Sequence, residues 1–139
     1  MVDAQQNVKK DRPVYRNIGL AQLIKYRLPW AGKVSILHRI SGATLFLMLP
    51  FLLYLFDQSL ASEISYQKFQ AITGNVLVKI VLLGLIWSFL HHFCAGIRYL
   101  LLDLDIGVEK LDANRSAIFV FFLGLALTAL VGLKLFGLY

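Results

Sequence analysis

The amino-acid sequence predicts an all-α membrane protein with three transmembrane helices. Hydrophobic residues make up 58% of its 139 residues and charged residues only 16%, which is far more apolar than an average soluble domain. Three stretches contain no Asp, Glu, Lys or Arg: residues 40–56, 80–97 and 116–133. A helix of roughly 20 residues, with about 17 as the lower limit, crosses the hydrocarbon core of a bilayer. Each stretch is therefore long enough for one span.

The excess positive charge lies ahead of the first apolar stretch. Up to Arg39 the chain has eight Lys and Arg against two Asp, and the remaining six basic and six acidic residues cancel. Because basic residues accumulate on the cytoplasmic side of membrane proteins, we expect a cytoplasmic N-terminus, the 57–73 loop outside, the 103–115 loop inside and the C-terminus outside. A basic excess beside a membrane span does not indicate binding to nucleic acid.

The N-terminal region resembles neither common targeting signal. Its first apolar run begins near residue 40, too late for a secretory signal peptide, and no amphipathic Arg- and Ser-rich transit peptide precedes it. We therefore expect the bacterial cytoplasmic (inner) membrane, crossed several times, with lipid as the surrounding partner.

A single transmembrane domain covering 1–139 is expected, because the chain contains neither an internal repeat nor a low-complexity tract. Its parts are a polar N-terminal segment, residues 1–32, and helices at about 33–56, 74–104 and 114–137. Pro29 suits a helix start, and Pro50 should kink the first helix, which a membrane bundle tolerates. The 57–73 loop is predicted to hold a short interfacial helix near 62–69.

The first helix places Ser35 on the same side as His38 and Arg39, at i,i+3 and i,i+4. Arg39 stands at the edge of the apolar span. A hydroxyl and a guanidinium can donate hydrogen bonds to a quinone carbonyl, and His38 with Arg39 can meet anionic haem propionates. The alternative is a positive-inside anchor combined with a polar contact between helices.

The second helix carries two adjacent histidines, His91 and His92, inside its apolar stretch. An ionisable side chain at membrane depth is a functional-site hypothesis by default, and a histidine ring nitrogen can hold haem iron. At 100° per residue, His92 shares a line with Gly96, Tyr99 and Asp103. Gly96 leaves room for a flat macrocycle, so His92 is the candidate ligand, while His91 is expected only to pack. The alternative for His92 is a hydrogen bond to a neighbouring helix.

Counting from the helix ends places the two candidate histidines at different depths. His92 is 11 residues from Asp103, which is about 16 Å along a helix, whereas His38 lies about 8 Å into its own helix. We therefore expect that a partner subunit, and not a second histidine of this chain, completes any haem site.

The third helix is interpreted as structural, because Lys134 is the first ionisable residue after its apolar stretch. Its small residues suit close packing: Gly124, Ala126, Thr128, Ala129 and Gly132. At the ends of the apolar stretches, Lys79, Arg98 and Lys134 are expected to snorkel outward.

Two motifs together resemble the larger cytochrome b membrane-anchor subunit of succinate dehydrogenase, respiratory complex II. The first helix reads Ser35-x-x-His38-Arg39-x-Ser41-Gly42, and the second reads His92-x-x-x-Gly96-Ile97-Arg98 followed by Asp103. Arg12-Pro13-Val14 also matches, so the resemblance covers most of the chain. Either motif alone is moderately specific, and the two at this separation are specific.

The resemblance implies that His92 is an axial ligand of haem b, with the opposite histidine supplied by the smaller anchor subunit. It implies that Ser35 and Arg39 line the ubiquinone site, and that His38 and Arg39 approach the haem propionates. An iron–sulfur subunit and a flavoprotein subunit would complete the complex, and the flavoprotein would oxidise succinate, so this chain itself is not expected to be an enzyme. Many members carry His where this chain has Tyr99, and that histidine's role is not transferred.

Two other functions are compatible with three apolar helices. One is a purely structural anchor whose histidines only pack and which binds no cofactor. The other is a small polytopic transporter with an Arg/His pathway, although the sequence has neither an inverted repeat nor a broken helix pair to favour it.

Overall fold

The computed structural model describes residues 19–138 and contains helices but no strand in that part of the chain. The helices are α1 (Leu20–Lys25), α2 (Trp30–Leu60), α3 (Glu63–Gly74), α4 (Val76–Asp103) and α5 (Lys110–Leu135). By length and composition, α2, α4 and α5 can each cross a membrane. The all-helical fold with three candidate spans is therefore confirmed. The expectations for most of the polar N-terminal segment, and the match at Arg12-Pro13-Val14, lie outside the described residues.

Local capping explains why the helices have these bounds. Pro29 is the N-cap of α2, with an extended backbone (φ −63°, ψ 160°), and the helix begins at the next residue, three positions before the expected 33. The short helix expected near 62–69 within the 57–73 loop is confirmed as α3, which runs five residues further, and α2 continues to Leu60 before it. Ser62 starts α3 with a capping box, in which its hydroxyl accepts from the Ser65 N–H and its own N–H donates to Ser65 Oγ.

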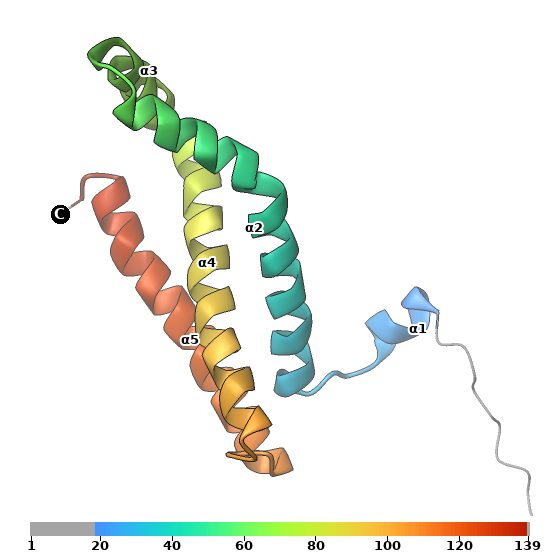
Figure 1. Cartoon of the computed structure of the whole chain (residues 1–139). Coiled ribbons are helices and arrows are strands. Elements are labelled where there is room, and N and C mark those ends of the chain that lie inside the picture. The colour runs from blue at the N-terminus through green and yellow to red at the C-terminus, as the bar shows by residue number, and fades with distance from the viewer. Residues whose placement is uncertain (1–18, 139) are drawn as a thin grey trace, which may run out of the picture.

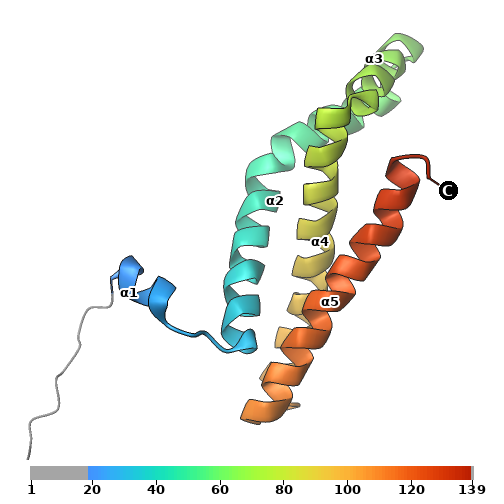
Figure 2. The same cartoon turned by 180° about the vertical axis from the view of Figure 1, so that it is seen from behind.

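The three long helices form an antiparallel bundle in which α4 packs against both α2 and α5 (Figure 1). Helix α2 changes direction in its second half, which contains Pro50. Proline lacks the N–H that would continue the helix ladder, so a bend is expected there. Figure 2 shows from behind that α4 and α5 lie close together at the end away from α3 and diverge towards α3.

Small residues form the packed face of α5. The buried positions recur every three or four residues: Ala117, Val120, Gly124, Thr128 and Gly132. A Cβ on Gly124 would lie 3.5 Å from the Cα of His91, so glycine lets the backbones of α4 and α5 approach closely. Of the small residues expected to pack, Ala126 and Ala129 are exposed.

Arg98 is buried against α5, and the expectation that it snorkels outward is wrong. Only 5% of its surface is exposed. Its Nε donates to Ser116 Oγ at 2.9 Å, and its Nη2 donates to the Ala113 carbonyl at 2.9 Å. The first turns of α5 thus offer acceptors within reach, and a guanidinium with partners inside the bundle need not extend to the membrane surface.

A second polar contact fastens the same end of the bundle. The backbone N–H of Ala31, in the first turn of α2, donates to Asn114 Oδ1 of α5 at 3.2 Å. The first four N–H groups of a helix have no partner within it. A side chain from a distant part of the chain therefore caps α2 and fixes α5 beside it.

Replacing Arg98 tests how much these hydrogen bonds contribute to stability. Arg98→Met keeps the apolar stem but leaves the Ser116 hydroxyl oxygen without its donor, and it leaves the Ala113 carbonyl with the Ser116 hydroxyl as its only side-chain donor. We expect the free energy of unfolding to fall by about 2 kcal/mol, measured by thermal denaturation of the purified protein in detergent. Arg115→Met, at an exposed position on α5, is the control and should change stability little. Equal stability of the two variants would contradict the assigned role.

Candidate functional site

Two half-buried histidines from different helices meet where α2 packs against α4. The rings of His38 on α2 and His92 on α4 are stacked, with centroids 4.1 Å apart and planes 5° from parallel. The expectation that they lie at different depths is therefore wrong. At the end of the bundle away from α3, helix α4 extends beyond the start of α2 (Figures 1 and 2). Because the helix ends are not level, residue counts from those ends do not give relative depth.

Hydrogen bonds hold the His92 ring by one nitrogen. Its Nδ1 lies 3.0 Å from the His38 carbonyl oxygen and 3.3 Å from Ser41 Oγ. The Ser41 hydroxyl donates its own hydrogen to the same carbonyl at 2.9 Å. Both neighbours of Nδ1 therefore act as acceptors, which assigns the proton of the neutral ring to Nδ1. The other nitrogen, Nε2, then carries the lone pair that a metal ligand requires.

Two glycines allow this arrangement. A Cβ on Gly42 would lie 2.8 Å from Cε1 of His92, so only glycine leaves space for the ring at this position. A Cβ on Gly96 would lie 3.7 Å from Nε2 of His38. The sequence predicts that the space beside Gly96 accommodates a macrocycle. In the structure the ring of His38 lies there.

Tyr99 extends the site along α4, as the helix phase indicates. Its ring centroid lies 5.1 Å from that of His38, and the guanidinium carbon of Arg98 lies 5.3 Å from the centre of the Tyr99 ring. The Tyr99 hydroxyl is buried and has no hydrogen-bond partner within residues 19–138. Asp103, one turn further on, is exposed.

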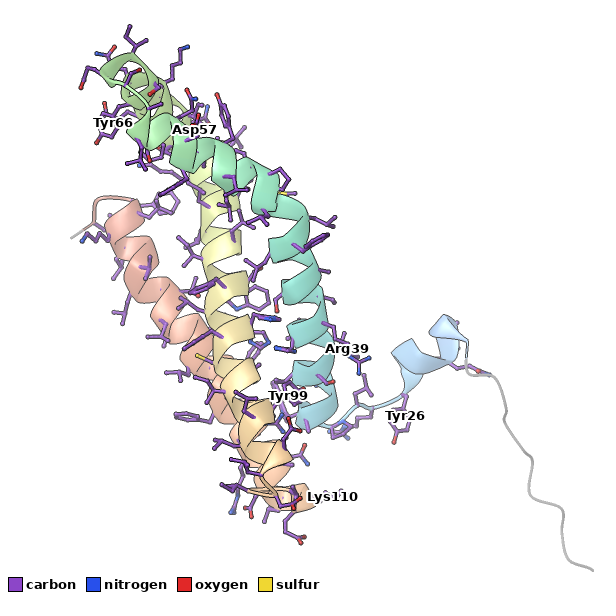
Figure 3. All side chains as sticks on the ribbon, viewed as in Figure 1. Tyr26, Arg39, Asp57, Tyr66, Tyr99 and Lys110 are labelled. Carbon is purple, nitrogen blue, oxygen red and sulfur yellow. The ribbon has the colours of Figure 1, made fainter. Side chains whose placement is uncertain are left out.

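The structure does not bring Arg39 to the stacked rings. Arg39 is exposed and points away from α4 and α5 (Figure 3). The side chains of consecutive helical residues point in directions about 100° apart, so Arg39 and His38 lie on different faces of α2. Ser35 is half-buried.

His91 has the packing role expected from its position on the helix. It is completely buried, its ring stacks on Trp87 with centroids 5.2 Å apart, and it meets Phe121 edge-on. Neither ring nitrogen has a hydrogen-bond partner in the part of the chain that the structure describes.

This geometry limits what the two rings can do. Axial ligands on opposite sides of one iron point their nitrogens at the metal, whereas stacked rings present their faces to each other. His38 and His92 therefore cannot hold one iron between them as arranged here. The hydrogen bond to α2 that the packing interpretation of His92 requires is present, but it uses Nδ1 alone.

Sequence reasoning missed two of the residues that build the site. Ser41 and Gly42 were noted as parts of a motif, but no role was assigned to either. Their signal is positional, because they follow His38 by three and four residues and so share its side of α2. Nothing in the sequence indicated that this side faces His92.

Comparisons with known proteins place the chain in a family. Residues 9–131 match the family of succinate dehydrogenase/fumarate reductase transmembrane subunits. The succinate dehydrogenase cytochrome b556 subunit of Coxiella burnetii is 34% identical over 111 residues, covering 79% of this chain and 89% of the relative. The subunit of the same name from Rickettsia felis is 26% identical over 131 residues, covering 94% and 98%. That of Paracoccus denitrificans is 29% identical over 92 residues, covering 66% and 71%.

The chain therefore belongs to the succinate dehydrogenase/fumarate reductase transmembrane subunits, and within them to the cytochrome b membrane anchors of succinate dehydrogenase. This agrees with three apolar helices long enough to span a membrane. In such a complex another subunit carries out catalysis, and this multi-pass chain anchors the assembly.

Replacing Gly42 tests the close approach of α2 and α4. Gly42→Ala places a methyl group against the His92 ring, so the ring or the helix must shift, and we expect a loss of about 1–3 kcal/mol of stability. Gly84→Ala is the matched control, since nothing lies within 4 Å of a Cβ there. It should be neutral or slightly stabilising, because alanine favours helix. Thermal denaturation of both variants measures the difference, and equal midpoints would contradict the geometry.

Proposed function

We propose that His92 supplies one axial ligand of haem b through Nε2 and that the smaller anchor subunit supplies the opposite histidine. The observation that carries this proposal is the hydrogen bonding of Nδ1 to the His38 carbonyl and Ser41. Metal-binding histidines commonly donate their second ring N–H to a carbonyl, which fixes the tautomer and the ring orientation. The cytochrome b names of the relatives agree with haem b.

The surroundings of His92 suit a haem shared between two chains. The ring is half-buried, and the His38 ring stacks against its face instead of pointing at the same metal, so the second ligand would come from outside this chain. Bound haem b would supply a one-electron carrier. The chain's own contribution is to hold Nε2 in one orientation and to exclude water from the ligand with its apolar helices.

We assign the propionates and the quinone to the end of α2 that lies near α1. His38 and Arg39 are proposed to meet the haem propionates, and Ser35 and Arg39 to donate hydrogen bonds to ubiquinone. The outward direction of Arg39 supports a ligand bound outside the three-helix bundle, between this chain and its partners (Figure 3). A quinone pocket inside the bundle would require Arg39 to face α4, and it does not.

The remaining assembly follows from the same interpretation. We propose a cytoplasmic N-terminus, an outer C-terminus, and an iron–sulfur subunit and flavoprotein docked on the cytoplasmic side of one transmembrane domain. The basic excess before Arg39 supports this orientation. Electrons from succinate would then reach ubiquinone beside α2.

A structural anchor without a cofactor is the second candidate. The observation that favours it is the hydrogen bond between His92 and α2, which on its own would explain a half-buried polar residue within an apolar span. The two candidates differ in whether Nε2 binds iron.

Histidine replacement separates these candidates. His92→Ala should remove or greatly weaken the b-type signal in a reduced-minus-oxidised absorption spectrum of the purified complex. His91→Ala should keep the signal, because His91 packs on the α5 side of the helix. Succinate oxidation by a soluble acceptor in membranes serves as the check on assembly. A wild-type complex without a b-type signal, or variants that lose it equally, would overturn the ligand assignment.

Replacements on α2 test the quinone site. Ser35→Ala and Arg39→Ala should each lower ubiquinone reduction by about tenfold or more, since each removes a hydrogen-bond donor and leaves a quinone carbonyl unpaired. Succinate oxidation by a soluble acceptor should stay at the wild-type rate. Arg115→Ala, exposed at the same end of the bundle, should leave both rates unchanged. Equal losses in both assays would indicate failed assembly and count against the site.

A further inference from the structure

A basic pocket lies at the other end of the bundle, where α3 meets the long helices. Its volume is about 570 Å³, and α2, α3, α4 and α5 all contribute to its lining. The polar lining residues are Gln70, Thr73, Lys79 and Lys134, and no acidic residue is among those that line it. The pocket therefore combines two ammonium groups with neutral hydrogen-bonding side chains.

The two lysines come from facing helices. Lys79 belongs to the first turn of α4, and Lys134 lies one residue before the end of α5. Lys79 is half-buried, and its Nζ lies 5.8 Å from the ring centre of Phe136. Two like charges that line one pocket repel each other, and a bound anion would remove this repulsion.

An apolar groove continues from the basic pocket. The groove has a volume of about 400 Å³, and its lining residues are all Leu, Ile, Phe or Val. Leu82 lines both the groove and the pocket. The groove reaches Leu45 on α2 and Val131 on α5, where α4 and α5 diverge (Figure 2). A charged cavity and an apolar groove thus share a wall.

We propose that the pocket and groove together bind one phospholipid with an anionic headgroup, whose phosphate contacts Lys79 and Lys134 and one of whose acyl chains fills the groove. Two ammonium groups that line one pocket attract the negative phosphate of an anionic headgroup. A soluble phosphate would leave the groove unfilled, and an apolar helix of another subunit would leave the lysines without an anion. This inference is independent of the haem and quinone proposals.

Lipid titration of the purified, delipidated complex tests the headgroup site. The probes are phosphatidylglycerol, phosphatidylcholine with the same acyl chains, and glycerol 3-phosphate, with bound lipid counted by native mass spectrometry. Each lysine near an anionic headgroup contributes roughly fivefold in affinity. The double variant Lys79→Gln, Lys134→Gln should therefore bind phosphatidylglycerol about 30-fold more weakly. Lys68→Gln, exposed on α3 outside the pocket, should bind it as the wild type does.

A second pair of variants tests the groove. Val131→Phe fills it and should weaken phosphatidylglycerol binding, whereas Leu130→Phe, exposed on the same helix outside the groove, should not. If phosphatidylcholine or glycerol 3-phosphate binds as tightly as phosphatidylglycerol, the proposal is overturned. So would a Val131→Phe complex that loses its smaller anchor subunit yet binds lipid normally, because a partner helix would then occupy the groove. If the double variant fails to assemble, the single variant Lys134→Gln is tested instead, and it should bind phosphatidylglycerol about fivefold more weakly.

Discussion

The contact between His92 and the backbone of α2 determines how the two helices that carry the site are placed. The His38 carbonyl accepts a hydrogen bond from the Ser41 hydroxyl and another from the His92 ring. No water is available in the hydrocarbon core to replace such a bond, so a buried ring N–H needs an acceptor within the bundle. The bond forms only because Gly42 leaves its side-chain space to the ring. The relative position of α2 and α4, and hence the stacking of the two histidines, follows from this contact.

The two ends of the bundle are built differently. At the end away from α3, Arg98 and Asn114 join three helices through hydrogen bonds, and the helices lie close together. Towards α3, α4 and α5 diverge, and the apolar groove and the basic pocket lie at that end of the bundle. The polar contacts thus stiffen the part that carries the histidines, while the other part depends on what fills its cavities.

The sequence was sufficient for the three spans, because the length of an uncharged stretch is a local property. The helix ends depend on caps, and the structure extends α2 to Leu60 and lengthens the short helix expected near 62–69 into α3. The prediction that His38 and His92 lie at different depths was wrong. Their relative depth depends on how far α4 extends past α2, which cannot be read from the sequence of either helix alone. Arg98 was misplaced for the same reason, since its acceptors belong to a helix that follows a turn. Helix phase alone favours His92 over His91 as a ligand. The two rings have different neighbours in the structure, and the ligand assignment stays a proposal.

The fixed orientation of His92 has a consequence for the order of assembly. Two rotatable bonds of its side chain are already held before any second chain arrives, since the restraining carbonyl, hydroxyl and glycine all belong to α2. Conformational entropy that is lost during folding is not lost again on binding, and preorganisation of this kind strengthens association without adding a contact. Under the proposed ligand assignment, the isolated anchor would therefore hold its imidazole in a fixed orientation before haem and the second anchor subunit bind.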